Sequence, residues 1–172
     1  MKMLAPVPGD KILDVGAGRG KVAKRVFASS SGLEVYTLEP AEKRVAIMKR
    51  DSPQLNSRVG GAEKMPFEGS FFDKAYTTMA AHHFRNLDSA LQEFARVLKE
   101  GGRFLILDVE PNVGSGRMLR FFENTVMRKH LEFLGLEQMK ARLVATGRFE
   151  IADSNREAFG YLLLCVKNVP KS

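Results

Sequence analysis

The stretch Leu13-Asp14-Val15-Gly16-Ala17-Gly18-Arg19-Gly20 decides the fold of this 172-residue chain. An apolar run ends at three glycines spaced two apart, and a helical pattern begins at Lys21. Strand, tight turn and helix in that order predict the first corner of a parallel α/β sheet. Glycines let the backbone turn sharply and approach a ligand closely, and the first amides of a helix favour an anion. The corner therefore predicts a nucleotide-binding site.

The glycine spacing narrows the class of nucleotide. The dinucleotide fingerprint is G-x-G-x-x-G, and Lys21 occupies the position of its last glycine. That mismatch argues against a nicotinamide dehydrogenase. Glu39 follows at the end of the next predicted strand, where a carboxylate can accept hydrogen bonds from both ribose hydroxyls.

Apolar strand-like runs alternate with segments of helical period along the chain, which predicts an α/β fold with a mostly parallel sheet. Strands are expected at residues 11–15, 34–38, 57–60, 74–79, 103–109, 149–153 and 159–167. Helices are expected after the glycine turn, at 41–50, at 89–99 and from Leu136. The link between the last two strands is too short for a parallel crossover, so these strands should pair antiparallel. Asp88 or Ser89 is expected to cap the helix at 89–99, and Gly101-Gly102 to stop it.

Composition is that of one ordinary globular domain spanning residues 1–172, with 44% hydrophobic and 27% charged residues. No apolar run approaches the roughly 20 residues of a membrane span, and the N-terminus has no apolar signal core. Cys165 is the only cysteine, which suits a reducing compartment. We therefore expect a cytoplasmic protein with no membrane span.

The chain is basic, with a formal net charge of +7 and a pI near 9.7. Such a charge can steer RNA, acidic lipid or phosphorylated metabolites, although a solvated basic surface is the simpler interpretation. No aromatic side chains interleave with the cations of residues 19–50 in a stacking pattern. Support for a nucleic-acid partner is therefore weak.

Residues 12–20 resemble motif I of class I S-adenosylmethionine-dependent methyltransferases. Three further segments resemble the same family in order and spacing: Leu38-Glu39-Pro40, residues 62–73 and residues 94–103. The resemblance runs from about residue 9 to residue 109 and is greatest to the ubiquinone/menaquinone-biosynthesis-like branch, methyltransferase type 11. It implies a Rossmann-like, seven-stranded, mostly parallel sheet with an antiparallel final strand and helices on both faces.

The resemblance also implies roles by position in a site for S-adenosyl-L-methionine and its product S-adenosyl-L-homocysteine. The loop around the methionine and ribose parts would be formed by Asp14, Gly16, Gly18 and Gly20. Glu39 would hold the ribose hydroxyls, and Pro40 would line the adenine. Ala62 would offer a backbone N–H to the adenine ring, with Glu63 as the nearby carboxylate, and Met79 and Ala80 would lie beside the methionine. Many members carry an acid just before the Ala-Glu pair, whereas this chain has Gly61.

Methyl transfer needs mostly positioning of the acceptor, and needs a base only if the nucleophile must lose a proton. The candidate bases are His82 and His83, which follow the fourth predicted strand. The alternative is that one or both only pack or cap the next turn. His130 is expected at the surface, and the three histidines and one cysteine are too scattered for a metal site.

The segment 110–135, with Phe121, Phe122 and Phe133, is the expected lid or substrate element, or alternatively another core helix. The chain begins only about ten residues before the first strand, whereas the family commonly carries N-terminal helices that close over the cofactor. The site would then be open, closed by this segment, or closed by a partner subunit in a homo-oligomer, unless the chain is shortened.

The leading function is methyl transfer from S-adenosylmethionine to a small-molecule acceptor. The net charge motivates one alternative, an RNA or protein methyltransferase, whose binding would depend steeply on salt. A second alternative is a cofactor-binding protein without transferase activity. The acceptor atom and pathway stay open.

Overall fold

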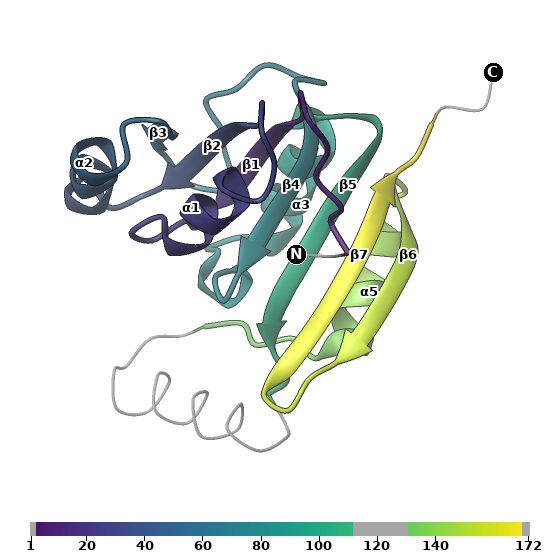
Figure 1. Ribbon diagram of the computed structural model, residues 1–172. Helices are drawn as coiled ribbons and strands as arrows, with labels where there is room; N and C mark the ends of the chain where they lie inside the picture. Colours follow the sequence, from purple (N-terminus) through teal and green to yellow (C-terminus); the bar gives the residue numbers. More distant parts are fainter. Residues whose placement is uncertain (1–2, 112–130, 170–172) are drawn as a thin grey trace.

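The computed structural model describes residues 3–111 and 131–169. Its centre is a seven-stranded sheet in the order β3-β2-β1-β4-β5-β7-β6 (Figure 1). The strands are β1 (Lys11–Val15), β2 (Glu34–Glu39), β3 (Asn56–Val59), β4 (Phe72–Thr78), β5 (Leu98–Val109), β6 (Phe149–Arg156) and β7 (Gly160–Lys167). The first five run parallel, and β7 pairs antiparallel with both β5 and β6. The expected fold, including the antiparallel ending, is confirmed.

Helices cover both faces of the sheet. They are α1 (Lys21–Phe27), α2 (Glu42–Asp51), the 3-10 turn η1 (Ala81–His83), α3 (Leu87–Val97) and α5 (Leu136–Ala145). The apolar side chains of α3 and α5 share one core cluster with Phe104 and Phe149. Those of α1 share a second cluster with Ile12 and Tyr76. Figure 1 shows α3 and α5 behind the sheet and α1 in front of it.

The strand order reverses at β1, which pairs with β2 on one side and β4 on the other. In an open α/β sheet such a switch point leaves a crevice at the carboxyl ends of the strands, where ligands bind. The glycine turn lies there, because the Gly16 and Ala17 amides donate to the Leu38 carbonyl at 2.8 and 3.2 Å. The glycine loop is therefore tied to the end of β2.

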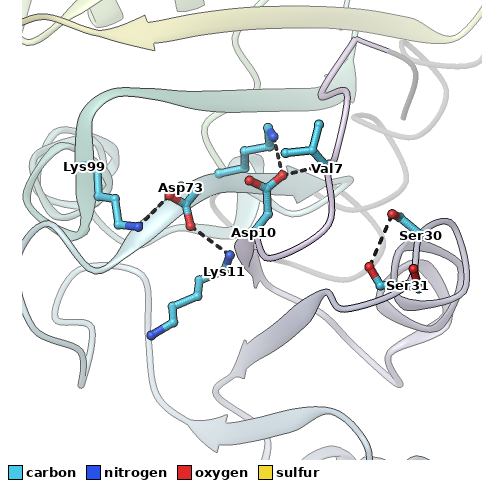
Figure 2. Close-up of polar contacts among 8 residues, drawn as sticks. Val7, Asp10, Lys11, Ser30, Ser31, Asp73 and Lys99 are labelled. Atoms are coloured by element: carbon cyan, nitrogen blue, oxygen red, sulfur yellow. Dashed lines mark hydrogen bonds and ion pairs between the residues drawn. The ribbon is translucent and has the colours of Figure 1, made fainter.

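A polar network fastens the opposite, amino-terminal ends of β1, β4 and β5 (Figure 2). The Asp73 carboxylate accepts from the Lys11 amide at 2.9 Å and from Lys99 Nζ at 2.6 Å. Asp10 accepts from the Val7 amide at 2.7 Å and forms a buried ion pair with Lys74. Because removal of either member of a buried ion pair is costly, the network holds the registers of these strands far from the crevice.

Two sequence expectations at α3 are wrong. The helix is capped by Asn86, whose side chain accepts from the Ser89 amide at 2.8 Å, and not by Asp88 or Ser89. It ends at Val97, and β5 begins at Leu98, so Gly101-Gly102 does not stop it. The glycines instead lie in an irregularity of β5, between the pairs Phe72↔Leu98 and Lys74↔Arg103. A Cβ at Gly102 would lie 2.8 Å from the Lys99 carbonyl oxygen, which explains why glycine is needed there.

Candidate functional site

A cavity of about 1080 Å³ opens at the carboxyl ends of β1, β2 and β4. Its walls come from the glycine loop, the turn after Glu39, residues 60–63, the end of β4 and the residues that follow η1. Drug-sized ligands occupy pockets of roughly 300–1,000 Å³, so this cavity can hold a nucleoside cofactor and a second small molecule together.

Gly16 allows the glycine loop to approach the end of β4. Its φ is +77°, and a Cβ built on it would lie 2.5 Å from the Cβ of Ala80. Met79, next to Ala80, has a φ of +52°, a conformation that non-glycine residues rarely adopt. Backbone strain of this kind clusters at functional sites, and here it bends the chain at the cavity wall.

Glu39 is the buried carboxylate of the cavity. Its Oε2 accepts from the Gly18 amide at 3.0 Å, and its Oε1 accepts from the Ala41 amide at 3.2 Å. Arg44 Nη1 lies 3.4 Å from the same Oε1 and is half exposed. An ionised carboxylate has about four acceptor positions, and these three donors occupy three of them, so one stays open for a hydroxyl donor. Displacement of the exposed Arg44 would free a second position, so that both ribose hydroxyls of a nucleoside could then donate to Glu39.

Asp14 lies beneath the loop and does not line the cavity. Burial raises its pKa to about 7, partly countered by the hydrogen bond from Tyr76 and reinforced by the charge of Glu39. The Tyr76 hydroxyl donates to Asp14 Oδ2 at 3.0 Å, and Oδ1 has no partner among the described residues. Burial and Asp14 also raise the pKa of Tyr76 well above its ordinary value. The Asp14 side chain thus links β1 to β4, immediately before the glycine loop.

Glu63 lies on the side of the cavity where the adenine is expected. Its Oε1 accepts from the Arg85 amide at 2.6 Å and from the Asn86 amide at 3.4 Å. A Cβ at Gly61 would lie 2.9 Å from Glu63 Oε2. The carboxylate therefore stiffens the segment entering α3, and its other oxygen is directed past Gly61, at the position where many family members carry an acid.

The two histidines have different surroundings. His83 lines the cavity, whereas His82 is buried and does not. His82 Nδ1 lies 2.6 Å from Asp108 Oδ1, and the His82 amide donates to Asp108 Oδ2 at 3.0 Å. The His82 ring stacks on Phe133, with 4.7 Å between centroids, and lies 4.2 Å from the His83 ring. Asp108 and Phe133 thus hold His82, which in turn packs beside His83.

The cavity gathers most of the predicted site residues from five separate segments. Those that line it are Gly16, Gly18, Glu39, Pro40, Ala62, Glu63, Met79, Ala80 and His83. Gly20 instead packs towards α2, where a Cβ would lie 2.9 Å from Met48 Sδ. Asp14, Gly20 and His82 therefore do not line the cavity.

Sequence reasoning missed several residues of this region. Asp108 is buried at the end of β5, and its position in an apolar strand beside the cavity strands is the signal that could have identified it. Arg25 and Arg44 line the cavity, but the sequence showed them only as members of a basic stretch, and Lys21, which also lines it, was noted only as a mismatch to the dinucleotide fingerprint. Their approach to the site depends on how α1 and α2 pack.

The predicted substrate element falls mainly outside the described residues. Phe121, Phe122 and His130 lie in residues 112–130, which the structure does not describe. The described ends of this segment meet, because the Leu136 amide donates to Glu110 Oε2 at 3.3 Å. Phe133 stacks on His82, so this end of the segment contacts the buried histidine next to His83.

Neither a metal centre nor a membrane span is found in the part of the chain that the structure describes. Within residues 3–111 and 131–169, no three His, Cys, Asp or Glu side chains are grouped so that they could hold an ion. In the same residues, no helix has the length and apolarity to cross a bilayer. Cys165 is buried, which raises its pKa to about 12.

Known proteins share both the sequence pattern and the fold. Residues 13–106 match the family model described as a methyltransferase domain. The ubiquinone/menaquinone biosynthesis C-methyltransferase UbiE of Cereibacter sphaeroides is 32% identical over 114 residues, covering 63% of this chain and 46% of its own. The sterol 4-C-methyltransferase strm-1 of Caenorhabditis elegans is 34% identical over 101 residues, covering 56% of this chain and 30% of its own. The chain thus spans about half or less of these relatives.

An S-adenosylmethionine-dependent methyltransferase from Mesorhizobium loti superposes with a TM-score of 0.81 at 16% identity, covering 96% of this chain and 95% of its own. The fold and the glycine-loop site define a class I methyltransferase domain. This chain belongs to the methyltransferase domain family, and ubiquinone/menaquinone biosynthesis C-methyltransferases are among the relatives that it resembles.

Proposed function

We propose that this chain binds S-adenosylmethionine and transfers its methyl group to a small, largely apolar acceptor. The observation that carries the proposal is Glu39, which is buried at the cavity wall and held by the Gly18 and Ala41 amides with acceptor capacity left over. The names of two relatives, a ubiquinone/menaquinone biosynthesis C-methyltransferase and a sterol 4-C-methyltransferase, support an apolar acceptor.

In this proposal the ribose hydroxyls donate to Glu39, and the adenine lies between Pro40 and residues 60–63. Met79 and Ala80 flank the methionine part. The cofactor supplies a methyl group on a positively charged sulfur, which is a good leaving group. The chain supplies position: it holds the acceptor in line with that methyl group and limits the approach of water.

His83 is the group that we assign to the acceptor, because it lines the cavity next to the end of β4. If the acceptor atom carries a proton, the His83 imidazole can take it near neutral pH. His82, whose ring is held by Asp108 and Phe133, is assigned to positioning. We also propose that the protein acts in the cytoplasm, supported by its single, buried cysteine.

The ribose assignment is tested by calorimetry with S-adenosylmethionine and S-adenosylhomocysteine. Glu39→Ala should weaken both affinities at least about tenfold, through loss of charge-assisted hydrogen bonds. Glu42→Ala, which removes an exposed acid at the start of α2, is the matched control and should change neither. Unchanged affinity in Glu39→Ala contradicts the assignment.

A competition experiment distinguishes a lost contact between Glu39 and the ribose hydroxyls from a glycine loop that Glu39→Ala has merely distorted. Wild-type protein should prefer adenosine to 2′,3′-dideoxyadenosine as a competitor, and Glu39→Ala should lose that preference. Transfer of labelled methyl from S-adenosylmethionine to quinol, sterol and phenol acceptors then tests activity. Tight cofactor binding without transfer to any acceptor of such a panel favours the cofactor-binding alternative.

A further inference from the structure

Beyond the expected cofactor residues, the cavity continues over the face of the sheet that α1 covers. Thr78, Leu107 and Leu162 lie side by side across β4, β5 and β7, as the pairs Thr78↔Leu107 and Leu107↔Leu162 show. Leu105 precedes Leu107 by two residues and therefore lies on the same face of β5. All four line the cavity, so its floor here is apolar.

The side wall above this floor is cationic. Lys21, Val22 and Arg25 of α1 line the cavity, and Lys21 and Arg25 are four residues apart, on one face of the helix. Both cations are exposed, and within residues 3–111 and 131–169 neither forms an ion pair or hydrogen bond. Two unpaired cations thus border an apolar floor inside one cavity.

The carboxylates of the cavity are engaged elsewhere. Glu39 is the last residue of β2, and Glu63 follows β3. Both strands lie on the other side of β1 from β4, β5 and β7. Glu39 is held by backbone amides and Arg44, and Glu63 by the Arg85 and Asn86 amides. Among the described residues, no acid lining the cavity therefore neutralises the wall formed by α1.

We propose that this extension is the acceptor subsite, and that it takes a small molecule with an apolar body and an anionic group, such as a carboxylate. The body packs on Leu107 and Leu162, which are partly exposed, and the anion pairs with Arg25. Arg25 is assigned over Lys21 because Lys21 adjoins the glycine loop, where the carboxylate of the cofactor itself is a competing partner. A guanidinium binds a carboxylate in a two-pronged geometry that adds specificity as well as affinity. This inference rests on the proposed function, since it names the class of acceptor for that site.

The test uses 2-naphthoate and its neutral isostere 2-naphthamide as probes, measured by calorimetry with and without saturating S-adenosylhomocysteine. Wild-type protein should bind 2-naphthoate about tenfold more tightly than 2-naphthamide. Arg25→Gln should bring the two within about twofold, and Arg25→Lys should keep part of the preference. Lys24→Gln removes an equal charge from an exposed residue of α1 that does not line the cavity, and should leave the preference intact. Leu162→Gln should weaken both probes and preserve their ratio.

Several results overturn the proposal. They are equal affinity of the two probes for wild-type protein, no binding of 2-naphthoate at millimolar concentration, and an unchanged ratio in Arg25→Gln. A tenfold loss of S-adenosylhomocysteine affinity in Arg25→Gln would assign the guanidinium to the cofactor and also overturn it. Exclusion of both probes by self-association, seen by sedimentation velocity, would make a second copy the occupant. The probes are also measured without S-adenosylhomocysteine. A protein that fails to bind the cofactor can therefore still show whether the subsite prefers 2-naphthoate.

Discussion

The imidazole Nδ1 of His82 lies 2.6 Å from Oδ1 of Asp108, and both side chains are almost completely buried. Asp108 also accepts from the backbone amides of His82 and Val109, so one carboxylate at the end of β5 fixes the whole turn after β4. Because a carboxylate only accepts, Nδ1 must carry the hydrogen. The turn that presents His83 to the cavity is therefore anchored from the neighbouring strand.

Asp108→Asn should disturb that anchor without changing the volume of the side chain. The amide offers one acceptor and one donor, so either the His82 amide or its ring faces an N–H group, and the ring can respond by moving its proton to Nε2. We expect a loss of about 1–3 kcal/mol in the free energy of unfolding. Ring ¹⁵N shifts of His82 should report the changed tautomer. Asp153→Asn, on an exposed part of β6, is the control; wild-type stability and ring shifts in Asp108→Asn would refute the anchor.

Gly16→Ala should destabilise the protein more than Gly18→Ala. Both positions have positive φ, at +77° and +60°, so both substitutions strain the backbone by about 1–2 kcal/mol. Only at Gly16 would the new methyl group also lie 2.5 Å from Ala80 Cβ, whereas nothing lies within 4 Å at Gly18. Overpacking adds about 1–3 kcal/mol, and urea denaturation should resolve the difference. Equal losses of unfolding free energy in the two variants would mean that Ala80 can move away from the new methyl group at no cost.

Asp14 should make stability depend on pH. Its folded pKa of about 7 exceeds the ordinary value of 3.8, so the folded state keeps a proton that the unfolded chain releases. The free energy of unfolding should therefore fall as the pH rises from about 4 to 7, and stay lower above that window. Asp14→Asn keeps an acceptor for Tyr76 and removes the titration. Between pH 5 and pH 8, wild-type protein should lose about 2–3 kcal/mol relative to the variant in urea unfolding. Parallel pH profiles would show that Asp14 is ionised throughout.

Asn86→Ala should cost about 1 kcal/mol, because the Ser89 amide at the start of α3 loses its acceptor. Ser89→Ala removes a side chain that the sequence suggested as the cap, and should change thermal stability by less than about 0.5 kcal/mol. A larger loss of stability in Ser89→Ala than in Asn86→Ala would show that Ser89, as the sequence suggested, caps the helix.

The sequence alone determined the architecture, because the patterns that specify each strand, turn and helix lie within short segments of the chain. The apolar run before Gly16 and the glycine turn specify β1 and its corner through backbone conformation alone. The order of strand and helix patterns then leaves few topologies, since parallel strands need crossovers and short links need hairpins. Glu39 could likewise be predicted, because its place at the end of β2 follows from one strand and one spacing.

Tertiary packing decided the rest. Asn86, and not Asp88, is the cap, in a turn whose Arg85 and Asn86 amides donate to Glu63. Gly101-Gly102 became part of β5, because that strand pairs with β4 on both sides of the two glycines. His82 and His83 are neighbours in sequence, yet only His83 lines the cavity, since Asp108 and Phe133 hold the other ring. The row of Thr78, Leu107 and Leu162, and its cationic wall on α1, exist only through strand register and helix packing. Residue type and spacing thus determined the glycine corner, whereas long-range contacts decided the surroundings of the proposed acceptor subsite, because no local pattern encodes which distant side chains meet there.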